Sequence, residues 1–306
     1  MAVLAPLAMR AGRSLDRAWR TTLLPLLDHP AVLLPRDFPL FLLGARTDAA
    51  IADVRAASGA RAAFEAIYTA SDDPWGSAAR RYRYQARKYE QIMALLPDRR
   101  FDEVLDLGCG LGLLSQHLAL RANRVLGLDL AGAALDHARR RGSLLDNLRF
   151  AQGDVLDLPA SMDGRFDLVV VADTLYYLSP LDDALLKRLS ARFAALLRPG
   201  GVCLLVNHYF FAADRESRQS RRIHDAFGWS AGFTVLSQHR RAFFLATLLA
   251  RAVPDDAAPD DTGPDDAGPD EAAPVRDPAV AGPAGEDAPA AAPVRRSSSP
   301  PECRTG

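Results

Sequence analysis

A glycine-rich segment between two apolar runs constrains the fold of this chain most strongly. Residues 104–112 read V-L-D-L-G-C-G-L-G, and V-L-G-L-D-L follows at 125–130. Short apolar runs bounded by turn residues are typical of buried strands, and the glycines lead directly into a stretch of helical character at 113–122. Glycines at such a turn let a ligand approach the backbone, where the N-terminus of the helix offers free N–H groups. The segment therefore predicts a ligand site at a strand-to-helix turn.

Three acidic residues around this segment indicate which ligand it binds. Asp129 follows Gly108 by 21 residues and ends the second apolar run, where a carboxylate can bind both hydroxyls of a ribose. The glycine spacing is G-x-G-x-G, and Asp106 precedes it, which disfavours a pyrophosphate but tolerates an ammonium or sulfonium charge. Asp154, after the third predicted strand, is placed to accept a hydrogen bond from an adenine amino group. We therefore expect an adenosine ligand without phosphates.

Strand-like and helix-like segments alternate from residue 83 onward. Such alternation requires a parallel sheet with helices on its faces. We expect an α/β fold with a doubly wound, mostly parallel, seven-stranded sheet. The segments 233–235 and 242–250 are expected to complete this sheet. The predicted strands are 102–107, 124–129, 148–151, 168–172, 202–207, 233–235 and 242–250; the predicted helices are 85–96, 112–122, 132–142, 181–197 and a short one beginning at 224–227, with a turn at 198–201.

The two ends of the chain differ from this central part, and three regions are expected. Residues 1–69 form an N-terminal extension that is partly helical, at 15–27 and 48–68, with prolines between these stretches. Residues 70–253 form the ligand-binding domain. Residues 254–306 begin with a proline at every fifth position and paired acids, which exclude a continuous helix, so we expect a disordered acidic tail rich in proline and alanine.

Composition excludes several classes of function. The chain has no stripe of lysine and arginine interleaved with aromatic residues, so we expect no nucleic-acid partner. Its three cysteines are too few and too scattered for a disulfide framework or a zinc site, and we expect no metal. The apolar runs at 23–27 and 40–43 are shorter than the ~20 residues of a membrane span. The order of charged and apolar residues at the N-terminus is wrong for a secretory signal, so we expect a cytoplasmic protein without a membrane partner. The oligomeric state stays open.

The motifs taken in order resemble those of a known enzyme family. Residues 106–112, Asp129, Asp154, 166–173 and 197–201 are similar to the motifs of class I S-adenosylmethionine-dependent methyltransferases, over about residues 70–250. The resemblance implies the Rossmann-like fold of that family and S-adenosyl-L-methionine as the cofactor. It also implies that adenine lies between Leu130 and Val155, and that Arg87 or Lys88, in a lid, pairs with the methionine carboxylate. The cofactor-binding residues that we expect are Trp75, Arg87, Asp106, Gly108, Gly110, Gly112, Asp129, Leu130, Asp154 and Val155.

A narrower resemblance concerns the acceptor of the methyl group. The segments D-D-P-W (72–75), R-Y-Q-A-R-K-Y-E (83–90) and D-T-L-Y-Y-L (173–178) are similar to those of the nodulation protein S-type methyltransferases, as are L-L-P (95–97) and L-L-V-N-H (204–208). Those enzymes N-methylate the free amine of a glucosamine residue on a chitooligosaccharide. The resemblance implies an amine on a small-molecule or carbohydrate acceptor. An O-methyltransferase of secondary metabolism and a non-catalytic adenosyl-binding or interaction protein are the alternatives.

Three residues are candidates for catalysis. Asp173 and Tyr176 follow the fourth predicted strand, and His208 follows the fifth. Methyl transfer is an in-line displacement from a sulfonium, so the protein mainly has to position and dehydrate the acceptor. An amine must react in its neutral form, and a carboxylate or an imidazole can take its proton. Asp173 and His208 are the candidate bases, and Tyr176 is expected at the mouth of the same strand.

Overall fold

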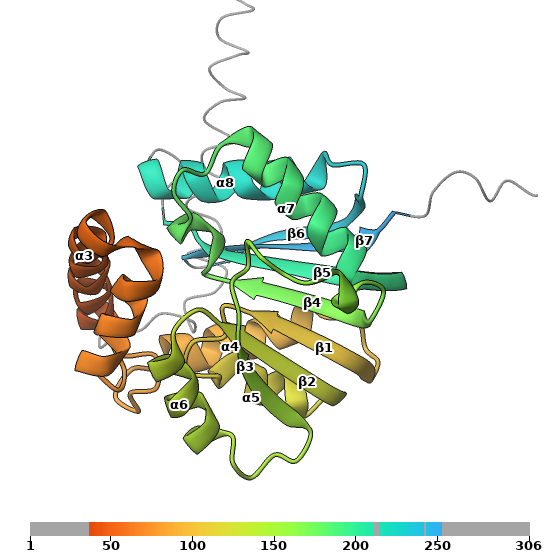
Figure 1. The fold of residues 1–306 in the computed structure, drawn as a ribbon. Helices are drawn as coiled ribbons and strands as arrows, with labels where there is room; N and C mark the ends of the chain where they lie inside the picture. The colour runs from red at the N-terminus through yellow and green to blue at the C-terminus, as the bar shows by residue number, and fades with distance from the viewer. Residues whose placement is uncertain (1–36, 211–213, 242, 253–306) are drawn as a thin grey trace, which may run out of the picture. The chain divides into compact units, whose positions relative to one another are not determined.

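A single mixed sheet of seven strands forms the centre of the fold (Figure 1). The computed structural model describes residues 37–210, 214–241 and 243–252. The strand order is β3-β2-β1-β4-β5-β7-β6; β7 runs antiparallel to both of its neighbours, and the other pairings are parallel. The strands are β1 (Phe101–Leu107), β2 (Ala122–Asp129), β3 (Leu148–Gln152), β4 (Phe166–Ala172), β5 (Leu197–His208), β6 (Phe233–Arg241) and β7 (Phe244–Arg251). The predicted α/β fold with a mostly parallel, seven-stranded sheet is confirmed.

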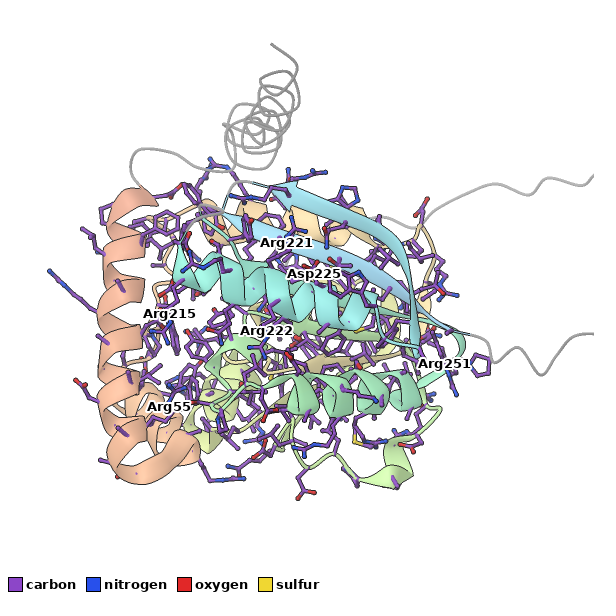
Figure 2. The ribbon with its side chains drawn as sticks, turned by 90° about the horizontal axis from the view of Figure 1, so that it is seen from above. Arg55, Arg215, Arg221, Arg222, Asp225 and Arg251 are labelled. Atoms are coloured by element: carbon purple, nitrogen blue, oxygen red, sulfur yellow. The ribbon has the colours of Figure 1, made fainter. Side chains whose placement is uncertain are left out.

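Helices cover both faces of this sheet. They are α3 (Phe38–Ala70), α4 (Tyr84–Leu95), α5 (Leu113–Ala119), α6 (Gly132–Arg141), α7 (Asp183–Leu196) and α8 (Arg215–Gly228), with short 3₁₀ helices η3 (Ala160–Met162) and η4 (Leu175–Tyr177). Phe193 of α7 and Phe227 of α8 pack on one face, and Figures 1 and 2 show these helices side by side. Ile92 of α4 and Leu118 of α5 pack on the other face. Because both faces are covered, β4 is apolar on both sides except at Asp167, as in a doubly wound fold.

Two local predictions are wrong. The short helix expected to begin at 224 starts at Arg215, because the buried face of α8 includes Ser217 and Ser220 and so lacks an apolar pattern in its first half. The turn expected at 198–201 lies within β5 instead. There the pairing with β4 shifts register, and Gly200 takes a left-handed φ of 74°.

The N-terminal helix α3 is longer than its predicted range of 48–68. It begins at Phe38, with a proline in the first turn, where the missing N–H costs no hydrogen bond. It bends at Gly59, whose φ of 82° and ψ of 171° are not helical. Figure 1 shows α3 standing across the ends toward which β1 and β4 point. The predictions for residues 15–27 and for the tail at 254–306 lie outside the described residues.

Side chains of α3 attach it to the domain. The carboxylate of Glu65 accepts hydrogen bonds from the backbone N–H groups of Gly132 and Ala133, at 2.7 and 3.1 Å. These are the first residues of α6, whose N-terminal N–H groups have no partner within the helix. Glu65 therefore caps α6 from another part of the chain.

In the described part of the chain, no helix is long and apolar enough to cross a membrane.

We expect Glu65→Ala to lower the free energy of unfolding by about 1–2 kcal/mol, because it removes the cap and a negative charge at the positive end of α6. Urea denaturation followed by circular dichroism measures this change. Asp53→Ala is the matched control, since Asp53 is an exposed carboxylate on the same helix. Equal losses in the two variants would contradict the capping role.

Candidate active site

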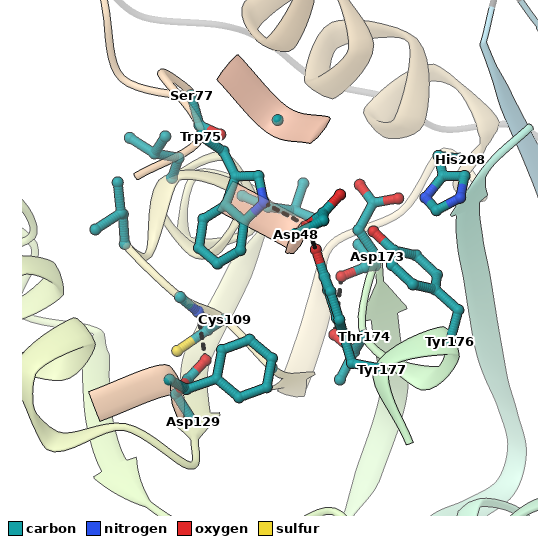
Figure 3. A pocket seen from close by; sticks show the side chains of 18 of the residues that line it. Asp48, Trp75, Ser77, Cys109, Asp129, Asp173, Thr174, Tyr176, Tyr177 and His208 are labelled. Carbon is teal, nitrogen blue, oxygen red and sulfur yellow. Dashed lines mark hydrogen bonds between the residues drawn. The ribbon is translucent and has the colours of Figure 1, made fainter. Parts of the chain in front are cut away.

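A cavity of about 650 Å³ lies at the carboxyl ends of the strands (Figure 3). The order of strands reverses between β1 and β4, and ligands of open α/β sheets bind at such a point. The glycine turn after β1 and the ends of β2, β4 and β5 form one side of the cavity, and α3 and α4 form the other. The sequence-predicted residues that line it are Trp75, Asp106, Gly108, Gly110, Asp129, Leu130, Asp154, Val155, Asp173, Tyr176 and His208.

The glycine turn brings backbone atoms to the surface of the cavity. Gly108 has a left-handed φ of 72°, and a Cβ atom there would lie 2.2 Å from Oγ1 of Thr174. The next glycine, Gly110, donates its N–H to Oδ2 of Asp129 at 2.8 Å, and Ala131 donates to Oδ1 at 3.0 Å. The carboxylate of Asp129 is thus oriented by two backbone groups. Burial raises the pKa of Asp129 above its usual value, so hydroxyl donors from a ligand would favour its charged form.

Two predicted residues are not among those that line the cavity. Gly112 caps α5 in a left-handed conformation, and a Cβ atom there would lie 2.6 Å from the ring of Phe150. This glycine therefore serves the packing of α5 against β3. The guanidinium of Arg87 lies 3.6 Å from Oδ2 of Asp37, and its neighbour Lys88 lines the cavity instead. A role of Arg87 toward the methionine carboxylate stays a prediction.

Asp173 forms an ion pair with Lys88 that sequence analysis did not anticipate. The ammonium of Lys88, from α4, contacts Oδ2 of Asp173, and the lysine is only 2% exposed. Asp173 follows β4 with a left-handed φ of 52°, a conformation that aspartate adopts more readily than most residues. Its other oxygen, Oδ1, is buried and has no hydrogen-bond partner among the described residues. Asp173 therefore presents a carboxylate at the cavity with one oxygen held and one available.

A second carboxylate reaches the cavity from α3. Oδ1 of Asp48 accepts hydrogen bonds from the indole of Trp75 at 3.0 Å and from the hydroxyl of Tyr177 at 2.7 Å. Figure 3 shows Asp48 on the same side of the cavity as Asp173 and His208. Asp48 was not predicted because it belongs to no local motif, and its contact with Tyr177 joins residues 129 positions apart.

His208, the last residue of β5, faces an acidic and aromatic environment. Its Nε2 lies 3.4 Å from Oε2 of Glu216 on α8, and this contact lowers the pKa of Glu216 below its usual value. The rings of His208 and Tyr176 meet edge to face, with centroids 4.1 Å apart. Glu216 was not predicted, because the first half of α8 was not recognised as a helix.

The charge of the cavity selects among ligands. Among the described lining residues, one ammonium group, that of Lys88, stands against six carboxyl groups. An excess of carboxylates favours ligands with an ammonium or sulfonium charge. Burial raises the pKa of Asp106 to about 6. Nowhere in the described ranges do three or more histidine, cysteine or acidic side chains form a metal-binding group. The six carboxyl groups that line the cavity are those of Asp48, Asp106, Asp129, Asp154, Asp173 and Glu216.

Comparison with known proteins agrees with this geometry. Residues 104–201 match the family model described as "Methyltransferase domain". This part of the chain is similar to methyltransferase domains. The matched region begins in β1, includes the glycine turn, Asp129 and Asp154, and ends in β5. The resemblance to class I S-adenosylmethionine-dependent methyltransferases, including the nodulation protein S type, is therefore confirmed.

Individual relatives are similar over part of their length. The chain is 42% identical over 113 residues to trans-aconitate 2-methyltransferase of Deinococcus radiodurans, which is 36% of this chain and 40% of the relative. It is 29% identical over 153 residues to nodulation protein S of Rhizobium tropici, which is 50% of this chain and 59% of the relative. The crystal structure of the N-methyltransferase NodS from Bradyrhizobium japonicum WM9 with S-adenosyl-L-homocysteine superposes with a TM-score of 0.52 and 21% identity. That match covers 61% of this chain and 96% of the other and shows a shared fold. The chain thus spans about half the length of these two curated relatives.

We expect Asp106→Asn to be more stable than the wild type at pH 8 by on the order of 2 kcal/mol, and the difference to vanish toward pH 4. The carboxyl has a pKa of about 6 in the folded chain and about 4 in the unfolded chain. Between these values the folded chain binds more protons, so its stability falls as pH rises. Urea titrations from pH 4 to 8 measure this.

Asp102→Asn is the control for this prediction, on the same strand. The hydrogen bond from Asn123 lowers the pKa of Asp102, so this variant should lose stability at pH 8. A stability difference between Asp106→Asn and wild type that stays constant with pH would contradict the assignment.

Proposed function

We propose that this chain transfers a methyl group from S-adenosyl-L-methionine to an amine of a small-molecule or carbohydrate acceptor. The observation that carries the proposal is the carboxylate of Asp173, whose Oδ1 is buried without a partner among the described residues, in a cavity rich in acidic groups. This arrangement suits a sulfonium donor and an amine acceptor in the same cavity. We further propose that residues 70–253 form the methyltransferase domain, that α3 covers its site, and that the protein acts in the cytoplasm.

The lining of the cavity fits S-adenosyl-L-methionine. Gly108 and Gly110 line the cavity in left-handed backbone conformations, and Asp129 offers a carboxylate whose two oxygens each accept a hydrogen bond from a backbone N–H. Leu130 and Val155 line the cavity with apolar side chains that can enclose an adenine ring. Asp154 would bind the adenine amino group, Asp106 the amino group of the methionine part, and Trp75 would cover the cofactor. When bound, the cofactor supplies a methyl group on a positively charged sulfur.

The residues near Asp173 would prepare the acceptor. Lys88 holds one oxygen of Asp173 in an ion pair, so the other oxygen can attract an ammonium and accept its proton. His208, paired with Glu216, is the second group that can move a proton away. Tyr176 packs against His208 and fixes its ring. The aromatic side chains of α3 and its neighbours exclude water from this region.

We expect Asp129→Ala to weaken the binding of S-adenosyl-L-methionine by at least about tenfold, because hydrogen bonds to a charged group are lost. Isothermal titration calorimetry measures this affinity. Asp136→Ala is the matched control, since Asp136 is an exposed aspartate on α6 that pairs with Arg139 away from the cavity. An unchanged affinity in Asp129→Ala would show that the ribose assignment is wrong, and absence of binding by the wild type would contradict the proposed function.

We expect N-methylated products when the chain is incubated with S-adenosyl-L-methionine and a panel of amino sugars and phenols, with mass spectrometry as the measurement. The reaction should continue in the presence of a chelator. Asp173→Asn should lower kcat roughly a hundredfold through loss of the base, while asparagine keeps the left-handed backbone conformation. Asp146→Asn, an exposed site, is the control.

Thermal unfolding of Asp173→Asn shows whether the loss of the pair with Lys88 has unfolded the chain. His208→Gln, which leaves that pair intact, should reduce kcat as well. Methylation of phenols alone would refute the amine acceptor.

A further inference from the structure

A second, smaller hollow of about 470 Å³ adjoins the cavity and has the opposite charge. Its charged lining residues in the described part of the chain are all arginines: Arg55, Arg215, Arg218 and Arg222. Tyr176 and Leu178 line both the hollow and the main cavity, so the two share a wall. An acidic cavity and a basic hollow therefore lie next to each other, on either side of Tyr176.

The basic character of the hollow results from the sequence of α8 and its position against α3. Arg215, Arg218 and Arg222 are spaced by three and four residues and share one face of α8. Figure 2 shows Arg215 and Arg222 on the side of α8 toward Arg55, whereas Arg221 lies on the opposite side. Arg221 donates instead to Gln238 of β6.

Hydrogen bonds fix two of these guanidinium groups at the hollow. Arg55 donates to the carbonyl of Tyr177 at 2.6 Å, and Arg222 donates to the carbonyl of Leu181 at 2.9 Å and to Asp183. Asp183 is 92% exposed and neutralises part of the charge of Arg222. Arg215 is the first residue of α8 and lies at the positive end of its dipole, where a negative charge is favoured. The hollow therefore suits an anionic ligand.

We propose that this hollow, defined by Arg55, Arg215, Arg218 and Arg222, binds a phosphate group of the acceptor. Guanidinium groups match phosphate oxygens in geometry and charge, and several of them favour a dianion over a single carboxylate. The proposal rests on the proposed function, because it places the amine of the same molecule in the acidic cavity near Asp173. The acceptor is then an amine that also carries a phosphate ester, anchored beyond Tyr176.

The first test measures binding without turnover. Inorganic phosphate is titrated calorimetrically into the full chain at low ionic strength. Arg215→Gln should weaken phosphate binding about tenfold, as expected for one charge-assisted contact, whereas Arg221→Gln on the opposite side of α8 should leave it unchanged. Arg215 is exposed, so its substitution should not unfold the chain. Equal phosphate affinities of the wild type and Arg215→Gln, or no binding by the wild type, would overturn the proposal.

The second test asks whether the anion belongs to the acceptor. Glucosamine and glucosamine 6-phosphate are compared as acceptors, with Arg55→Gln as a second variant. We expect the wild type to have a lower KM for the phosphate ester than for glucosamine. In Arg215→Gln and in Arg55→Gln, the KM for the phosphate ester should rise about tenfold, while the KM for glucosamine stays the same. Arg215→Gln should retain the kcat of the wild type. Phosphate binding without any preference for the ester would overturn the assignment to the acceptor and indicate a site for free phosphate. If the wild type methylates neither compound and does not bind the cofactor, the proposed function is wrong. The phosphate titration then still decides whether the hollow binds phosphate.

Discussion

The carboxylate of Asp129 joins the parts of the chain on which the candidate site depends. It accepts one hydrogen bond from Gly110, in the turn after β1, and one from Ala131, directly before α6. The connections that follow β1 and β2 are thereby fixed relative to the end of β2. Since Glu65 of α3 caps the first residues of α6, the position of α3 over the cavity depends on the same region.

Three charged side chains of α3 contact other parts of the chain. Asp48 binds Trp75 and Tyr177, Arg55 binds the carbonyl of Tyr177, and Glu65 binds the start of α6. Aromatic contacts between Phe64, Trp75 and Tyr177 fill the space between these polar contacts. Closure of the cavity is therefore the result of several directional interactions, in addition to apolar burial, and it brings both a carboxylate and a guanidinium to the region of η4.

Charge is separated across Tyr176 and Tyr177. The cavity on one side carries the carboxylates of Asp48 and Asp173, and the hollow on the other side carries arginines of α3 and α8. Burial raises the pKa of both tyrosines well above the usual value, so they stay neutral between the two fields. An acceptor with a positive and a negative end would be oriented by this separation before any specific contact forms.

The sequence by itself determined the sheet, the glycine turn and the acidic strand ends, including Asp106, Asp129, Asp154 and Asp173. These features are local, because each carboxylate lies at a fixed place in a strand or just after it, and parallel strands bring such places to one edge. Only the tertiary structure decided the ion pair of Lys88 with Asp173, across 85 residues, and the bond of Asp48 with Tyr177, across 129. The start of α8 and its arginine face also required it, since serines replace the apolar residues that would reveal a buried helix face. Contacts between distant segments depend on how helices pack, and local patterns in the chain do not contain that information.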